Sequence, residues 1–267
     1  MLHTLRSSLR AAFSETGRRG FTLIEIAIVL VVIGLIVSGG LLAVSPVLQS
    51  AKITETRQKM ATIESALLGY VIANGCLPCP AARNIGGTIT GIANDGSDYT
   101  TACGSDGTCL GATNNASGLV PWVTLGISEN DATDGWGRLF SYGADSTLTN
   151  SSTDVQRTSG TFPTFTSNIQ MNSTGGTNLG YTAIAYVIVS HGLDGSFGET
   201  FQAQALADKY GSAANSGQNE NGDSDLTFVT GNTIGSNNSS YYDDLTSFKS
   251  LQPLIISCGA GSCGNPS

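Results

Sequence analysis

The feature that most constrains this chain is a long apolar segment near its start. From Phe21 to Leu48 the sequence reads FTLIEIAIVLVVIGLIVSGGLLAVSPVL, and its only charged residue is Glu25. As an α-helix this segment would be roughly 42 Å long, which exceeds the ~30 Å hydrocarbon core of a bilayer. We therefore expect residues 21–48 to be able to span a membrane.

Two simpler interpretations fit this segment less well. A cleavable secretory signal has an apolar stretch of about 7–15 residues followed by a cleavage site with small residues, and here the stretch is longer and no such site follows. A plain signal anchor, held with its basic end in the cytoplasm, fits the length but leaves Glu25 unexplained. A charge of this kind in the middle of a membrane helix costs on the order of 2.5–3.5 kcal/mol, so we expect a partner that neutralises Glu25.

The residues at the start of the segment resemble a known family. Gly20 follows two arginines and precedes Phe21-Thr22-Leu23-Ile24-Glu25, which is similar to the class III signal of type IV pilins and type II secretion pseudopilins. The resemblance implies that a prepilin peptidase removes the leader, residues 1–20, and that the new N-terminal Phe21 is methylated. It also implies assembly with other pilin subunits at an inner-membrane platform, with the C-terminal domain in the periplasm or outside the cell.

The physical chemistry of Glu25 is consistent with this resemblance. Cleavage after Gly20 would expose the ammonium group of Phe21, which could pair with the Glu25 carboxylate of a neighbouring subunit. Burying the two charges together costs less than burying either one alone. We therefore assign Phe21 and Glu25 to assembly rather than to catalysis.

The charge balance argues against a nucleic-acid partner. Removing residues 1–20 takes away four of the 12 basic residues and one of the 20 acidic ones, which leaves eleven net negative charges. No run rich in lysine or arginine is present. A compact cytosolic enzyme is also a poor fit, because only 12% of the residues are charged and 34 are glycine.

The helix is expected to continue through residues 49–75, beyond lipid, as an amphipathic segment that packs on a globular domain. Its apolar positions recur at spacings of three, four and seven residues: Ile53, Met60, Ile63, Leu67 and either Tyr70 or Val71. Asn74-Gly75 is a plausible end signal.

Residues 76–267 are expected to form the globular domain. Its sequence predicts strands at 138–142, 181–190, 226–230 and 251–257, and a short helix at 201–210. The fold class is therefore α+β, with a long N-terminal helix packed on a small antiparallel sheet and long polar loops.

Six cysteines in a translocated domain favour disulfides over free thiols. We favour a Cys258–Cys263 bond, with Cys76 and Cys79 linked to Cys103 and Cys109 in an order that the sequence leaves open. The alternatives for Cys76-x2-Cys79 are a zinc half-site or a redox pair, but the other spacings are not those of zinc sites.

A second resemblance covers two further motifs. Residues 134–142 read DGWGRLFSY and are similar to the Asp-x-Trp-Gly turn-and-strand motif of major pseudopilins, with Leu139 where proline is common. Residues 77–81 (LPCPA) and 119–126 (LVPWVTLG) are similar to a Cys-Pro-Ala loop and a Pro-Trp segment of some prepilin-like proteins. We expect Trp136 to anchor the core beside a turn.

The pseudopilin resemblance also implies a calcium site. A Gly-x-Asp-Gly turn and a later acidic loop supply the candidate ligands Asp194, Asp223 and Asp225, and calcium prefers such oxygen ligands. The spacing is not that of an EF-hand, and Asp-Gly turns are common without a metal. Calcium is therefore a possible cofactor, and no other is indicated.

No catalytic motif accompanies these features. His191 is the only histidine after residue 20, and no nucleophile elbow, phosphate-binding loop or zinc-protease motif is present. We predict a structural subunit, either a pseudopilin or a pilin, and not an enzyme. The alternatives are an adhesin, DNA-uptake or ligand-binding tip pilin, and a membrane-anchored enzyme that would hold His191 beside a serine and a carboxylate.

Overall fold

The computed structural model describes residues 20–83, 109, 117–149, 165–200, 221–222, 225–232, 241–258 and 263, without side chains at residues 37–45. The chain divides into two compact units, Met1–Leu48 and Gln49–Ser267. The short helix expected at 201–210 lies outside the described residues.

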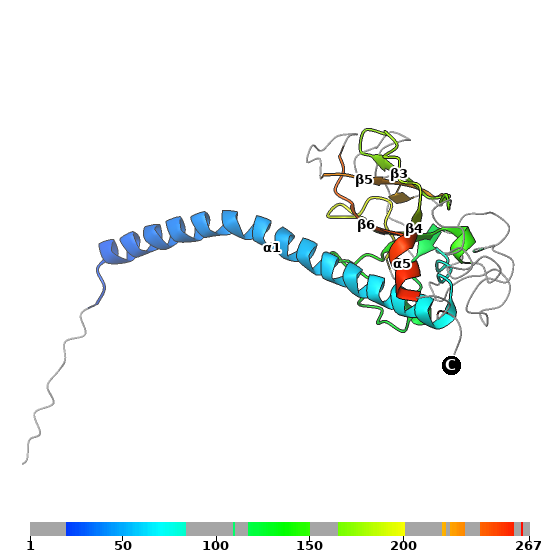
Figure 1. The fold of residues 1–267 in the computed structure, drawn as a ribbon. Coiled ribbons are helices and arrows are strands. Elements are labelled where there is room, and N and C mark those ends of the chain that lie inside the picture. Colours follow the sequence, from blue (N-terminus) through cyan, green and yellow to red (C-terminus); the bar gives the residue numbers. More distant parts are fainter. Residues whose placement is uncertain are drawn as a thin grey trace, which may run out of the picture. The chain divides into compact units, whose positions relative to one another are not determined.

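The first element is the long helix α1, Leu23–Asn74, drawn from blue to cyan in Figure 1. The expected stop at residues 74–75 is present. Gly75 adopts φ 80° and its N–H donates to the carbonyl of Val71 at 2.7 Å, which is the left-handed glycine cap typical of helix ends. In the second unit, α1 buries the predicted apolar stripe at Met60, Ile63, Leu67 and Val71.

A four-stranded antiparallel sheet forms the centre of the second unit. Its order is β1 (Ser117–Leu119), β2 (Ser141–Ala144), β4 (Ile184–Ser190) and β6 (Leu245–Ser250). Every residue of β4 is buried, because this apolar strand lies between two others and is covered on both faces. The sequence predicted this strand, and the antiparallel sheet confirms the α+β class.

The two faces of the sheet contact different layers. One face packs against α1 and the C-terminal helix α5 (Leu251–Cys258), through β4 residues Ala185, Tyr186 and Ile188. The other face, through Ile184, Val187 and Val189, packs on Met171 and Phe228. A register shift between Ile184 and Tyr186 explains why the adjacent residues Ala185 and Tyr186 face the same side.

Three predicted strands need correction. Residues 251–257 form α5 and not a strand, because Leu251, Leu254 and Cys258 are buried at helical spacing. The strand expected at 138–142 begins only at Ser141, and before it Leu139 makes only isolated bridges with Thr133 and Glu199, after the turn at 135–137. The strand expected at 226–230 exists as β5 (Thr227–Thr230), but it pairs in parallel with β3 (Gln170–Ser173) outside the antiparallel sheet.

Two described disulfides lie in the second unit, one after α1 and one near the C-terminus. Cys79 is bonded to Cys109 and Cys258 to Cys263, the second being the pairing that the sequence favoured. Cys76 is also disulfide-bonded, and Cys103 lies outside the described residues. The remaining elements are the short helix α2 (Trp122–Leu125) and the 3-10 turn η1 (Ser146–Leu148).

Candidate functional site

Thr22 and Glu25 together cap the start of α1. The Glu25 carboxylate accepts hydrogen bonds from the Thr22 backbone N–H and hydroxyl, both at 2.9 Å. In return, the Glu25 backbone N–H donates to the Thr22 hydroxyl at 3.3 Å. This reciprocal pattern is a capping box, so the sequence Thr-x-x-Glu fixes where the helix begins. Gly20 and Phe21 immediately precede the capping box.

Large apolar side chains are exposed throughout the described start of α1. Phe21 is 81% exposed and Leu23 is 92% exposed, and the same holds for the residues that follow in the first unit. These further exposed residues are Ile24, Ile26, Ile28, Val29, Leu30, Val31, Val32, Ile33, Leu35, Ile36, Val47 and Leu48. An extended apolar surface of this kind, interrupted here by the exposed Glu25, marks a site that contacts lipid or another protein.

Counting the described residues alone, none of the helices offers an apolar run of membrane-crossing length.

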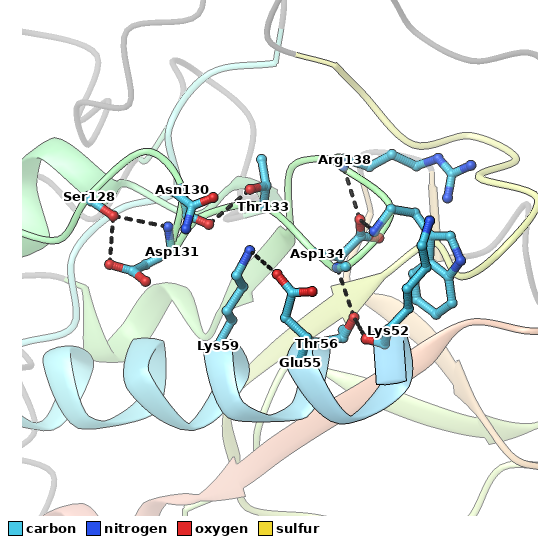
Figure 2. Close-up of polar contacts among 12 residues, drawn as sticks. Lys52, Glu55, Thr56, Lys59, Ser128, Asn130, Asp131, Thr133, Asp134 and Arg138 are labelled. Carbon is cyan, nitrogen blue, oxygen red and sulfur yellow. Dashed lines mark hydrogen bonds and ion pairs between the residues drawn. The ribbon is translucent and has the colours of Figure 1, made fainter. Parts of the chain in front are cut away.

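In the second unit, the DGWG motif forms a tight turn that lies directly on α1 (Figure 2). The Gly135 N–H donates to the Thr56 hydroxyl at 2.9 Å, and that hydroxyl donates to the Lys52 carbonyl at 2.8 Å. A Cβ at Gly135 would lie 2.5 Å from the Lys52 carbonyl oxygen, so only glycine permits this approach. Asp134 closes the turn by accepting from the N–H groups of Trp136 and Arg138, both at 2.9 Å.

The tryptophan that anchors the core is not the expected one. Trp136 is only half-buried, on the turn itself. Trp122 is buried instead, against Leu119, Ala132 and Leu139. The turn therefore owes its position to its backbone contacts with α1 and to Asp134.

Hydrogen bonds also connect the DGWG turn to the loop after β4. The Asp134 carboxylate accepts from the Ser190 hydroxyl at 2.8 Å, and the Arg138 guanidinium donates to the carbonyls of Gly192 and Leu193, the latter at 3.0 Å. Burial raises the pKa of Asp134, partly opposed by these hydrogen bonds and by the charge of Arg138. The sequence indicated both segments, but not that Arg138 links them.

The candidate calcium ligands are engaged locally. The Asp194 carboxylate accepts from the Ser196 N–H at 3.0 Å and the Ser196 hydroxyl at 2.9 Å, while Asp225 accepts from the Thr227 N–H at 2.7 Å. Asp223 lies outside the described residues. Within the part of the chain that the structure describes, no three acidic, histidine or cysteine side chains converge on a common metal position.

His191 lies beside a serine, deep in the domain. Its Nε2 is 2.8 Å from the Ser141 hydroxyl, and both residues are completely buried. Burial, followed by the charges of Arg83 and Arg138, lowers the pKa of His191 to about 3, so the imidazole is neutral at physiological pH. A neutral imidazole can accept the serine proton, but a substrate could not reach this pair without movement of the surrounding chain.

A pocket of about 360 Å³ lies between α1 and the start of β6. Arg57 and Glu64 line it from α1, and Asp244 lines it from the segment before β6. Asp244 is 3% exposed, and its Oδ2 accepts from the Asn221 amide at 2.9 Å, while Oδ1 has no hydrogen-bond partner among the residues that the structure describes. Burial raises the pKa of Asp244 well above its usual value. Nothing in the local sequence pointed to Asp244.

Comparison with known families finds a match at the capped helix start. Residues 16–41 match the family described as the prokaryotic N-terminal methylation motif. The chain carries the type IV pilin and pseudopilin signature. The matched residues contain Gly20, Phe21 and the capping box, and thus the site to which the sequence had assigned processing and assembly. No curated protein and no solved structure matches this pilin-like chain.

Proposed function

We propose that this pilin-like chain is a structural subunit, a pseudopilin or minor pilin, of a type IV filament or a type II secretion-like machine. The leader is cut after Gly20, residues 21–48 insert in the inner membrane, and the subunit then assembles through the same helix. The globular domain faces the periplasm or the outside of the cell.

The observation that carries the proposal is the methylation motif at residues 16–41, which includes the start of α1, where the described large apolar side chains are exposed. Such a helix needs an apolar environment, and lipid before assembly and neighbouring helices afterwards both provide one. The acidic Glu25 then needs a cation, which a trimmed Phe21 of the next subunit supplies.

The first test is the mass of the N-terminal peptide of the native protein, produced together with its prepilin peptidase. We expect a chain that begins at Phe21 and carries one additional methyl group on its amine. A protein that retains residues 1–20 in the presence of an active peptidase contradicts the proposal.

The second test separates the charge of Glu25 from its role in the capping box. Glu25→Gln removes the charge, but glutamine can still accept the hydrogen bonds from Thr22, since Glu and Gln both serve at this position of a capping box. We expect this variant to be processed and held in the membrane but depleted from sheared filaments.

The matched control for that test is Glu55→Gln, which removes an exposed carboxylate that pairs with Lys59 at 2.9 Å on the same helix. We expect the control to enter filaments at the level of the natural protein. Equal incorporation of both variants contradicts the assembly role of the Glu25 charge.

A further inference from the structure

Acidic side chains gather around the loop after β4, residues 191–195. Asp134 and Asp243 are buried beside it, Asp194 lies within it, and Asp244 follows Asp243. Three of these carboxylates affect one another: burial and then the charge of Asp194 raise the pKa of Asp243, and burial and then the charges of Asp243 and Asp194 raise the pKa of Asp244. A loop with this much nearby negative charge needs a compensating cation.

Arg138 donates hydrogen bonds to the carbonyls of this loop, whereas Arg83, whose charge also acts on His191, pairs with Glu199. One nitrogen of the Arg138 guanidinium donates to the Gly192 carbonyl and the other to the Leu193 carbonyl at 3.0 Å. A guanidinium holds two such acceptors in a fixed geometry, which a lysine ammonium does not.

The loop is shaped around this side chain. Gly195 adopts φ +67°, and a Cβ there would overlap the Arg138 guanidinium. Gly192 adopts φ +59°, and a Cβ there would lie 2.5 Å from the carboxyl carbon of Asp243. Both glycines therefore permit a close approach of a charged side chain, in addition to their left-handed conformations.

The other side of the loop is held by an acid. Asp243 Oδ2 accepts from the N–H groups of Leu193 at 2.6 Å and Asp194 at 3.0 Å. The loop thus presents its carbonyls to Arg138 and its N–H groups to Asp243. Opposite charges are matched to opposite ends of the peptide dipoles.

The described residues do not fit the calcium ion that the family resemblance implies. Calcium takes six to eight oxygen ligands, many of them backbone carbonyls and carboxylates. Here the carbonyls of Gly192 and Leu193 accept from Arg138, and each oxygen of Asp194 accepts from Ser196. A divalent ion at these carbonyls would compete with a guanidinium of the same sign of charge.

We propose that Arg138 takes the place of a divalent cation in this loop, so that the folded domain does not depend on calcium. The inference concerns the globular domain alone and does not rest on filament assembly. Arg138 acts here as a positioning residue, because it connects two segments: the loop after β4 and the DGWG turn that lies on α1.

The experiment is thermal unfolding of the processed full chain in detergent micelles, followed by tryptophan fluorescence, in millimolar calcium and in excess EGTA. We expect the natural protein to unfold at the same temperature in both conditions. Arg138→Met should lower the unfolding temperature by at least ~5 °C in both, because two charge-assisted hydrogen bonds are lost. Arg138→Lys should lower it less, because the charge is kept.

The matched control is Arg57→Met, which removes the same charge from an exposed arginine of the same unit and should leave the unfolding temperature unchanged. A fall of several degrees when calcium is removed from the natural protein overturns the proposal. Unfolding of Arg138→Met at the temperature of the natural protein overturns it equally. If Arg138→Met does not fold, the calcium dependence of the natural protein and of Arg138→Lys still decides the question.

Discussion

The buried imidazole of His191 should make the stability of the domain depend on pH in a way that one substitution can isolate. The pKa of His191 falls from 6.5 to about 3 on folding. A group whose pKa is lowered in the folded state stabilises that state above its unfolded pKa and loses this contribution as the pH falls. The affected window runs from about pH 6.5 downwards.

The size of the effect follows from proton linkage. At pH 5 the unfolded histidine is almost fully protonated, while the folded one, with a pKa of about 3, is not. Between pH 7 and pH 5 the folded state should therefore lose about 2 kcal/mol of stability through His191. The buried acids Asp134, Asp243 and Asp244 act in the opposite direction, because their pKa values are raised by burial.

The contribution of the acids cancels when the natural protein is compared with His191→Gln, because both proteins contain them. In this variant the amide can still form a hydrogen bond with the Ser141 hydroxyl but cannot titrate. Urea unfolding of the processed chain, followed by the fluorescence of Trp122 and Trp136, gives the free energy of unfolding at pH 7 and pH 5. We expect the stability advantage of the natural protein over the variant to shrink by about 2 kcal/mol on going to pH 5.

The reasoning is refuted if that advantage is the same at both pH values. An independent readout uses the natural protein alone, since His191 is the only histidine after residue 20. Its imidazole resonances in an NMR titration should stay those of the neutral form down to pH 5. A midpoint near 6.5 would show that the imidazole is open to water.

Four further variants have expected outcomes that chemical denaturation measures. Gly135→Ala should cost about 1–3 kcal/mol, because its Cβ would lie 2.5 Å from the Lys52 carbonyl oxygen, whereas Gly69→Ala, with nothing within 4 Å, should stabilise α1 by about 0.5–1 kcal/mol. Leu67→Ala should cost about 2–5 kcal/mol, because that side chain is completely buried between α1 and the sheet, and a smaller loss would mean a loosely packed core. Asp244→Asn should gain stability over the natural protein as the pH rises from 5 to 7, because the raised pKa of Asp244 makes its ionised form unfavourable in the fold, and a gain independent of pH would contradict this.

The features that the sequence predicted well have local causes. The buried stripe of α1 follows from apolar residues at helical spacing, and its end at Gly75 follows from the conformational freedom of glycine. The buried strand β4 follows from a short apolar run rich in β-branched residues. Each of these patterns is complete within a few turns or residues.

Short apolar runs are ambiguous, and α5 shows why. Residues 251–257 contain four apolar residues and a proline, which the sequence analysis interpreted as a strand. Pro253 lies in the first turn of α5, where its missing N–H removes no hydrogen bond of the helix. The choice between helix and strand was decided by burial of Leu251 and Leu254 against distant residues, which a local window does not contain.

The hydrogen bonds that connect the loop after β4 to Arg138 and Asp243 could not be predicted from the sequence, for the same reason. Arg138, Gly192 and Asp243 are separated by about fifty residues at each step, and only the sheet brings them together. The sequence identified the two glycine-rich turns, but a pairing between them leaves no periodic signal. Asp244 and the parallel partner of β5 were missed on the same grounds.

The capping box at the start of α1 has a consequence for the maturation of the chain. All of its hydrogen-bonding atoms belong to Thr22 and Glu25, so scission after Gly20 would remove none of them. The precursor and the trimmed protein can therefore share the same first turn of α1. The new amine of Phe21 would then lie next to a helix start that has already formed. Docking into a growing fibre would then require the glutamate to exchange or share its threonine contacts, without any refolding of the rod behind it.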